Sequence, residues 1–281
     1  MLHRSFSVSL IVAAVFVAAC ASSGEDATTT SVQEPVATTA SPLAEPAVGG
    51  FHPDDKGWEL IWSDEFDGTQ LDETKWGHEV NCWGGGNQEQ QCYTDRPENT
   101  FVTDGILHIK AVLEEFTGLD GHEDWANADQ LGTTTLPYTS GRIRTKGKGD
   151  WRYGRFEIRA LLPYGQGTWP AIWMLPTDNT YGGWAASGEI DIMEAVNLKT
   201  VFSPDNNAVH GTLHFGAEWP ANVQAGTYLQ LFDEHPADFF HVYALEWEEG
   251  EMRWYVDDVH YATRTFWWST GGPFPAPFDV D

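Results

Sequence analysis

Positive charge is scarce in this chain. Its 281 residues include 15 lysines and arginines against 42 aspartates and glutamates, which gives a formal net charge of −27 at pH 7. A field of this sign repels nucleic acids, anionic lipids and sulfated or uronic polysaccharides, so none of these is an expected partner. A neutral glycan is unaffected by it. The excess of acids also serves solubility, and the composition does not separate the two explanations.

Long apolar runs are scarce as well, and the sequence has neither internal repeats nor an extended helical period. The stretch from Phe6 to Ala19 follows His3-Arg4 and is too short to span a membrane comfortably. It leads into Val17-Ala18-Ala19-Cys20, which resembles a bacterial lipobox. We therefore expect residues 1–19 to be a lipoprotein signal peptide and Cys20 to carry a lipid. An ordinary signal peptide followed by a chance cysteine is the alternative.

Only three cysteines are present. With Cys20 assigned to the lipid, Cys82 and Cys92 remain as an even pair in an oxidising compartment. We expect a disulfide between them that closes a short loop. A zinc site is not expected, because no histidine or second cysteine pair lies nearby in the sequence.

The domain organisation follows from a shift in composition. Residues 20–56 are rich in Thr, Ser, Ala, Pro and Glu and lack apolar periodicity, which is typical of a disordered linker. Residues 57–281 are then one domain, of a size that suits an all-β sandwich. The protein is expected outside the cytoplasm, either lipid-anchored at the bacterial cell surface or secreted, and its membrane contact is expected only through Cys20.

Aromatic residues, by contrast, are plentiful, with 14 Trp, 9 Tyr and 15 Phe. A large core needs some of these rings, but so many tryptophans also suggest exposed platforms on which sugars stack. Within residues 168–175, a period of two places Trp169, Ala171 and Trp173 on one face of a strand. That face is either stacked core or a sugar platform, and the pattern favours neither.

Short strand-like runs recur between Gly, Pro and Asp turns, which is typical of a β-meander. Many short antiparallel strands without helices predict an all-β sandwich or jelly roll. In one run His210, Thr212 and His214 share a polar face, which is either a cleft wall or a solvated surface. The expected strands are Glu59–Asp64, Gly105–Leu113, Ser140–Thr145, Arg155–Leu162, Thr168–Leu175, Glu189–Glu194, Ala208–Phe215, Val242–Trp247, Met252–Val256 and Val259–Thr265.

The most specific pattern is the acidic run Glu189–Glu194, in which apolar residues alternate with acids as in a half-buried strand. Alternation puts Glu189 and Asp191 on one face, but the third acid, Glu194, arrives one residue late. A β-bulge at Ile192–Met193 would absorb the extra residue and point all three carboxylates the same way. The α-carbons of the two glutamates would then lie about 13 Å apart. Side chains that lean together could approach the carboxyl separation of about 5–5.5 Å found in retaining glycosidases.

Asp191 would lie between the two glutamates, close enough to share a proton with one of them and to separate their pKa values. The alternatives are a solvated strand face and a cation site. Both are disfavoured, because acids are depleted from strands and the one-residue offset is so specific.

Several motifs together resemble glycoside hydrolase family 16, and in particular its bacterial laminarinase-like (endo-β-1,3-glucanase) branch. The resemblance covers roughly Gly57 to the C-terminus. It implies a concanavalin A-like β-jelly roll of two curved antiparallel sheets, with the concave sheet forming an open glycan cleft. The motifs are Trp62-Ser63-Asp64-Glu65-Phe66-Asp67-Gly68, Gly86-Asn87-Gln88-Glu89, Tyr138-Thr139-Ser140-Gly141-Arg142, Tyr153-Gly154-Arg155-Phe156-Glu157, Trp169-Pro170-Ala171-Ile172-Trp173-Met174-Leu175-Pro176 and Gly188-Glu189-Ile190-Asp191-Ile192-Met193-Glu194.

By this resemblance Glu189 is the nucleophile, Glu194 is the acid/base, and Asp191 tunes the nucleophile. Other matching positions contact substrate: polar donors in the minus subsites, stacking faces, and a histidine beside the catalytic row. In that order they are Asn87 and Arg142, then Trp169, Trp173 and Trp184, then His214.

The chemistry implied by the resemblance needs no cofactor. Many family members bind a structural Ca²⁺, for which Glu65 and Gly105 are the candidate ligands here. The chain ends at Pro277–Asp281, where the resemblance implies a further core strand. We therefore expect the domain to be truncated at its C-terminus, with an exposed apolar seam and low solubility or activity, and we expect a monomer.

The predicted function is retaining endo-hydrolysis of a neutral β-1,3-glucan of the laminarin type. Agarase, carrageenase, transglycosylase and mixed-linkage glucanase are alternatives within the family. The acidic charge disfavours sulfated carrageenan, and mixed-linkage enzymes typically read E-x-D-x-E. The alternative of another class is a surface lipoprotein that binds glycan without cutting it, and the presence of both Glu189 and Glu194 disfavours it.

Overall fold

The computed structural model describes residues 8–13, 58–124, 127–201 and 206–279. These ranges contain β-strands and two short 3-10 helices but no α-helix, so the predicted all-β class is confirmed. Nor does any helix within them have the length and apolar character needed to cross a membrane. Cys20 and the predicted linker 20–56 lie outside the described residues.

The larger sheet has eight strands, and its main path runs β14-β13-β12-β11-β1-β8-β2, with β9 paired to β1. Its pairings are antiparallel, and β14 and β2 are the ends of the path. The strands are β1 (Val8–Ala13), β2 (Gly77–His78), β8 (Arg142–Arg144), β9 (Asp150–Trp151), β11 (Ala171–Pro176), β12 (Glu189–Glu194), β13 (Ala208–Phe215) and β14 (Val223–Gln230).

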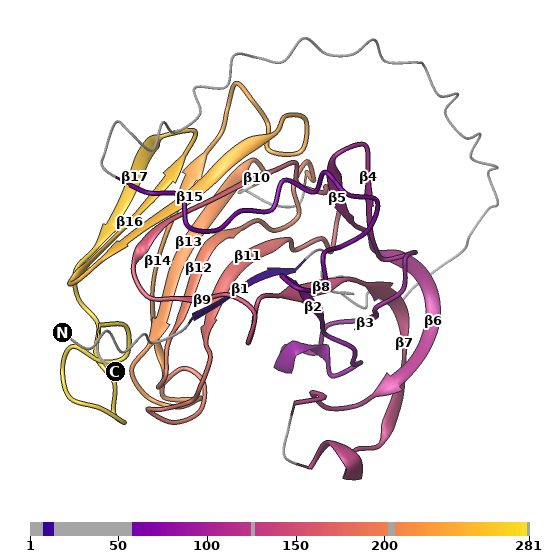
Figure 1. Cartoon of the computed structure of the whole chain (residues 1–281), viewed down its shortest axis with the longest axis horizontal. Helices are drawn as coiled ribbons and strands as arrows, with labels where there is room; N and C mark the ends of the chain where they lie inside the picture. The colour runs from indigo at the N-terminus through magenta and orange to yellow at the C-terminus, as the bar shows by residue number, and fades with distance from the viewer. Residues whose placement is uncertain (1–7, 14–57, 125–126, 202–205, 280–281) are drawn as a thin grey trace.

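A four-stranded antiparallel sheet, β10-β15-β16-β17, lies against the β11–β14 part of the larger sheet (Figure 1). Ile190 and Leu213 from the larger sheet and Trp247 and Trp254 from the smaller one are buried in the common core. Each sheet thus hides one apolar face, which leaves the other face of β11–β14 free for polar residues. The strands are β10 (Gly154–Ala160), β15 (His241–Glu248), β16 (Glu251–Val256) and β17 (Val259–Arg264).

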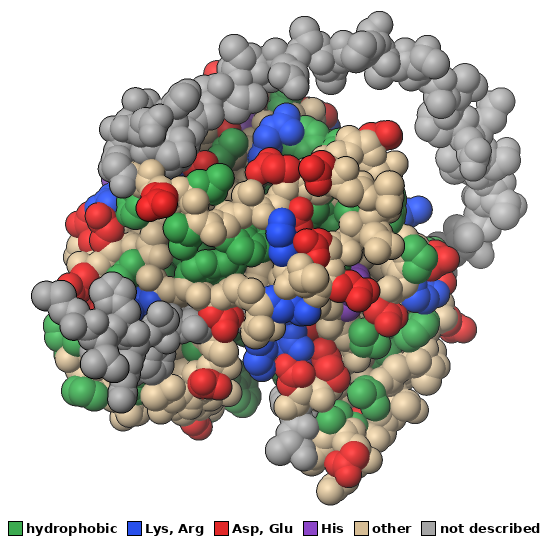
Figure 2. Space-filling view, in the orientation of Figure 1, with side chains coloured by type: hydrophobic (Ala, Val, Ile, Leu, Met, Phe, Trp, Pro, Cys, Tyr) green, Lys and Arg blue, Asp and Glu red, His purple; other side chains and the backbone are tan. Residues whose placement is uncertain are grey.

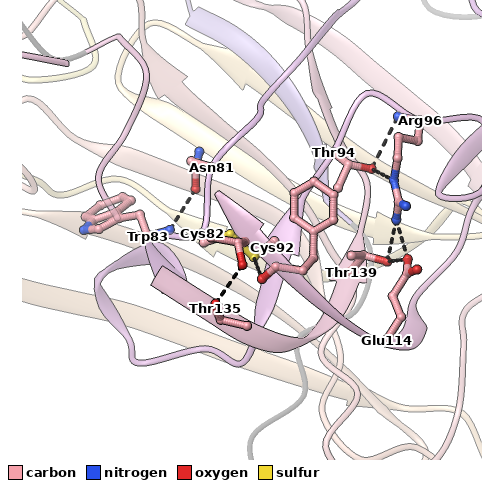
Figure 3. The surroundings of a disulfide bond; sticks show 11 residues. Asn81, Cys82, Trp83, Cys92, Thr94, Arg96, Glu114, Thr135 and Thr139 are labelled. Atoms are coloured by element: carbon pink, nitrogen blue, oxygen red, sulfur yellow. Dashed lines mark hydrogen bonds and ion pairs between the residues drawn. A yellow bond between two sulfur atoms is a disulfide. The ribbon is translucent and has the colours of Figure 1, made fainter. Parts of the chain in front are cut away.

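A three-stranded sheet, β3-β7-β6, and the hairpin β4-β5 lie on the other side of the molecule (Figure 1). The predicted Cys82–Cys92 disulfide is confirmed and joins β3 to the preceding loop (Figure 3). A Cβ added to Gly118 on β6 would lie 2.8 Å from Cys82 Sγ, so this close approach requires glycine. The elements are β3 (Gln91–Tyr93), β4 (Thr100–Thr103), β5 (Ile106–Ile109), β6 (Val112–Leu119), β7 (Thr133–Ser140), η2 (Gly84–Gly86) and η3 (Ala128–Gln130).

Strand β1 was expected as part of a signal peptide and is found in the middle of the larger sheet. It lies between β11 and β8 and is antiparallel to both, with Ile11 opposite Trp173 on one side and Arg144 on the other. The apolar stretch that predicts a signal sequence thus pairs on both sides as a strand within the larger sheet.

Two predicted strands need correction. Glu59–Asp64 forms no strand, because no strand of the described ranges pairs with it, and Leu60 and Ile61 are 70% and 75% exposed. Gly105–Leu113 is divided, since β5 ends at Ile109 and β6 begins at Val112. Figure 2 shows acidic side chains spread over one face of the molecule, whereas the basic ones gather in a central band.

Candidate active site

The acidic run forms β12, and the predicted bulge is confirmed. On β11 the adjacent residues Ile172 and Trp173 pair with Met193 and Asp191, so Ile192 is the extra residue of β12. A bulge of this kind bends a strand locally and re-aims its side chains.

The pairing with β13 shows the same offset. The three-residue step from Asp191 to Glu194 on β12 spans only the two-residue step from Thr212 to His210 on β13. Ile192 and Met193 can consequently both be buried in the core. Glu194 returns to the face that carries Asp191 and, on β13, His210 and His214.

Each glutamate of the row is held by a separate indole. Trp184 Nε1 donates a hydrogen bond to Glu189 Oε2 at 2.7 Å, and Trp169 Nε1 donates to Glu194 Oε1 at 2.8 Å. Trp184 is 39% exposed, so its ring also borders solvent. Trp169 and Trp184, two of the three tryptophans predicted as stacking faces, therefore fix the orientation of the two carboxylates.

Asp191 lies deepest in the row and is 2% exposed. His214 Nε2 lies 3.3 Å from Asp191 Oδ2 and 3.8 Å from Glu189 Oε1, which places His214 beside the row as expected. From the core side, Trp254 Nε1 donates to the backbone carbonyl of Asp191 at 2.8 Å. Trp254 is a supporting residue that sequence analysis missed, because it comes from the opposite sheet.

Burial raises the pKa of all three carboxyls. Desolvation is the largest cause in each, and the charge of a neighbouring acid adds to it at Glu189 and Asp191. The pKa of Glu189 rises to about 8, and the pKa of Asp191 rises well above the usual range. The row therefore retains protons at neutral pH. Because the charge of Asp191 is the second cause at Glu189, a proton on Asp191 makes Glu189 easier to ionise.

The β11 side of the row is a wall built on Trp173 and Arg142. The Arg142 guanidinium lies 4.5 Å from the centre of the Trp173 ring, and Arg142 is only 4% exposed. Its Nε lies 3.1 Å from Glu79 Oε1. Burial alone would raise the pKa of Glu79, but Arg142 and His122 reverse this and lower it. Arg142 is thus held by its ion pair with Glu79 and does not extend freely into solvent.

Asn87 lies on the surface near this wall. Its Nδ2 donates to Glu89 Oε1 at 3.0 Å, and Gln91 Nε2 donates to Glu89 Oε2 at 2.9 Å. Burial raises the pKa of Glu89 to about 7. Glu89 belongs to a motif that the sequence displays, but nothing in the pattern indicated that it is buried and holds Asn87.

Three groups of described residues bring metal-ligating atoms within 4.8 Å of one another. One is Glu189, Asp191 and His214, and another is Glu79, His122 and Glu123, where Arg142 and Arg144 already supply positive charge. Glu65 belongs to none of them. Glu65 and Gly105 are both exposed, and the calcium site stays a prediction.

The family model for glycosyl hydrolases family 16 matches residues 112–278. The chain is 42% identical over 236 residues to "Glucan endo-1,3-beta-glucosidase A1" of Niallia circulans and 47% identical over 209 residues to "Beta-glucanase" of Rhodothermus marinus. These alignments cover 79% and 73% of this chain but 32% and 64% of those proteins. The chain therefore spans less than two thirds of the length of either relative.

Among solved structures, the laminarinase from Rhodothermus marinus is similar with a TM-score of 0.60 at 44% sequence identity. The match covers 73% of this chain and 74% of that chain.

Proposed function

The chain belongs to glycosyl hydrolase family 16, and from that premise we propose that it is a retaining endo-hydrolase of laminarin-type β-1,3-glucan. The observation that carries the proposal is the β12 row. Its bulge brings Glu189, Asp191 and Glu194 to one face, and two separate indoles orient the two glutamates. Two carboxyls that flank one bond are the machinery of glycoside hydrolysis.

The proposed reaction has two displacements. Glu194 gives its proton to the glycosidic oxygen while the Glu189 carboxylate attacks the anomeric carbon, which releases the first product and leaves a glycosyl ester on Glu189. Glu194, now ionised, then takes a proton from a water molecule. The resulting hydroxide equivalent attacks the anomeric carbon and frees Glu189.

The surroundings suit these roles. Burial raises the pKa of Glu194, in the direction that favours the proton needed for the first step. Burial raises the pKa of Glu189 as well, and the Trp184 N–H partly offsets that rise by favouring the ionised form that a nucleophile requires. Asp191 in its protonated form spares Glu189 a neighbouring negative charge. The uncharged substrate is compatible with the net charge of −27.

The finer features of the prediction belong to the same proposal. We assign the two packed sheets to a concanavalin A-like jelly roll whose β11–β14 face forms the glycan cleft. Arg142 and Asn87 then line the minus subsites, and Trp169, Trp173 and Trp184 supply stacking faces. An extracytoplasmic location is supported by the Cys82–Cys92 disulfide, since such bonds persist in oxidising compartments. A lipid at Cys20 and a structural Ca²⁺ at Glu65 and Gly105 remain part of the proposal.

The test is reducing-sugar release from laminarin, lichenan and agarose side by side, with the anomer of the first product followed by NMR. We expect cleavage of laminarin with retention of configuration. Glu189→Gln should abolish turnover and keep laminarin binding, whereas Glu98→Gln, at an exposed acid outside the site, should behave as wild type. Activity on agarose alone would refute the substrate class. Binding of laminarin by the wild type without turnover would show a glycan-binding protein instead.

A further inference from the structure

The β14 edge of the larger sheet, where Arg264 donates to the backbone oxygens of Ala225 and Gly226, carries side chains that the proposed chemistry leaves unused. Cross-strand pairing puts His210 opposite Glu194, and Tyr228 of the edge strand β14 opposite His210. The rings of His210 and Tyr228 have centroids 5.8 Å apart. Tyr228 is 55% exposed. A row thus runs from the proposed acid/base across β13 to an exposed aromatic ring on β14.

The neighbouring row has no side chain at the edge. Thr212 pairs with Asp191, and Gly226 of β14 pairs with Thr212. A Cβ added to Gly226 would lie 3.2 Å from Thr212 Oγ1, so Gly226 faces the same side as the carboxyls. Tyr228 and Gln224, two residues to either side of Gly226, are exposed on this face, whereas Ala225, Thr227 and Leu229 of the other face are half-buried. In line with Asp191, the edge strand therefore has no side chain on this face, and larger side chains lie on either side of that position.

The direction of the substrate follows from the carboxyl row. Glu189 and Glu194 succeed one another along β12 and must flank the bond that is cut. The sugar chain therefore crosses the strands rather than following them. On one side of β12 it meets the wall of Trp173 and the buried Arg142, and on the other side it meets β13 and the edge strand β14.

Only one of these two sides leads directly to an edge of the sheet. In a double displacement the leaving half of the glycan must depart before water attacks, while the other half stays bound to the nucleophile. The side that ends at exposed Gln224, Gly226 and Tyr228 suits departure, and the side walled by Trp173 and Arg142 suits retention.

We propose that Tyr228, packed beside His210, is a stacking platform for the leaving-group half of the glycan, and that the chain exits over Gly226. This inference rests on the proposed function. β14 lies two strand spacings, about 10 Å, from β12. Tyr228 therefore lies under the second sugar of the leaving group rather than the first. An aromatic ring offers such a sugar a flat apolar face at little cost in side-chain entropy.

The test compares two substrates that differ in what they place on the leaving-group side. Laminarihexaose places sugars over β14, whereas an aryl β-laminaribioside has a phenol as its leaving group and reaches no further than the first position. Tyr228→Ala should lower kcat/KM for laminarihexaose roughly five- to tenfold and leave kcat/KM for the aryl glycoside within about twofold of wild type. Tyr228→Phe keeps the ring and should resemble wild type on both substrates.

A matched control is Tyr164→Ala, which removes an exposed tyrosine from the loop after β10 and should change neither value. Gly226→Leu provides a second variant, since its side chain would stand in the exit and should again impair only the hexaose. Equal losses on both substrates, or no loss on either, would overturn the inference. A folded wild type that turns over neither substrate would refute the proposed function itself, which separates the two failures.

Discussion

Replacing Trp169 by phenylalanine tests how the acid/base is tuned. Trp169→Phe keeps an aromatic ring and removes the N–H that donates to Glu194 Oε1 at 2.8 Å. That bond favours the ionised carboxylate and opposes the burial that raises the pKa of Glu194. A hydrogen bond to a charged group contributes about 1.5–3 kcal/mol, and one pH unit corresponds to about 1.4 kcal/mol. Loss of this bond should therefore raise the pKa of Glu194 by about one to two units. The limb of the pH–activity profile that Glu194 governs should move upward by the same amount.

The limb that moves is determined by the role of Glu194. As the acid of the first step it must carry a proton, so its ionisation sets the alkaline limb of kcat/KM against pH. The assay is the pH profile of laminarin hydrolysis by wild type and variant. An alkaline limb that stays in place or moves down would refute the reasoning.

Trp184→Phe is the matched comparison for this measurement. It removes the bond to Glu189 Oε2 at 2.7 Å and should also raise a pKa. Because the nucleophile must be ionised, here the acid limb should move upward. If both variants moved the same limb, the two indoles would not act on carboxyls with different roles.

Three further predictions concern the scaffold. Gly211→Ala would place a Cβ 2.4 Å from Trp254 Cδ1, and we expect the free energy of unfolding in urea to fall by about 1–3 kcal/mol. An unchanged urea midpoint would contradict this. Replacing both Cys82 and Cys92 by serine should lower the free energy of unfolding by about 2–3 kcal/mol without moving either limb of the pH profile; a shifted limb would tie the disulfide to the site. The folded-state pKa of Glu89 is raised to about 7, so its stabilising effect is present at low pH and is lost as pH rises toward 7. Relative to Glu89→Gln, the wild type should therefore lose up to about 3 kcal/mol between pH 4.5 and 7, and parallel stability curves would contradict this.

The catalytic strand could be predicted from sequence because its structure is local. A strand with one buried face has a period of two, and a bulge shifts the phase of that period by one residue. The observed bounds of β12, Glu189–Glu194, and of β13, Ala208–Phe215, equal the expected ones. The polar face of His210, Thr212 and His214 is likewise found beside the acids.

The parts that sequence analysis missed depend on strand order, which local periodicity does not contain. The ion pair of Arg142 with Glu79 joins β8 to the segment just after β2. It holds Arg142 as a buried part of the cleft wall, whereas the sequence suggested a donor free to reach the sugar. The roles of Glu89 and Tyr228 can be inferred only from their contacts with Asn87 and His210, which the sequence pattern does not show. Glu59–Asp64 shows the converse, since a plausible strand pattern forms no strand without a partner to pair with.

Strand β1 lies between the two strands that carry the wall, β11 with Trp173 and β8 with Arg142. Its residue Ala13 lies between Ala171 on β11 and Arg142 on β8, so β1 is what links the strand that carries Arg142 to the catalytic half of the sheet. Among the described strands, β12 itself pairs with β11 and β13 alone. Removing residues 1–19, as the predicted signal cleavage would, should therefore raise KM for laminarin and lower the melting temperature while leaving both limbs of the pH profile in place. A synthetic peptide of residues 8–13 added to the shortened chain should restore the melting temperature by pairing between β11 and β8. An unchanged KM and melting temperature would show that the wall of Trp173 and Arg142 does not depend on β1.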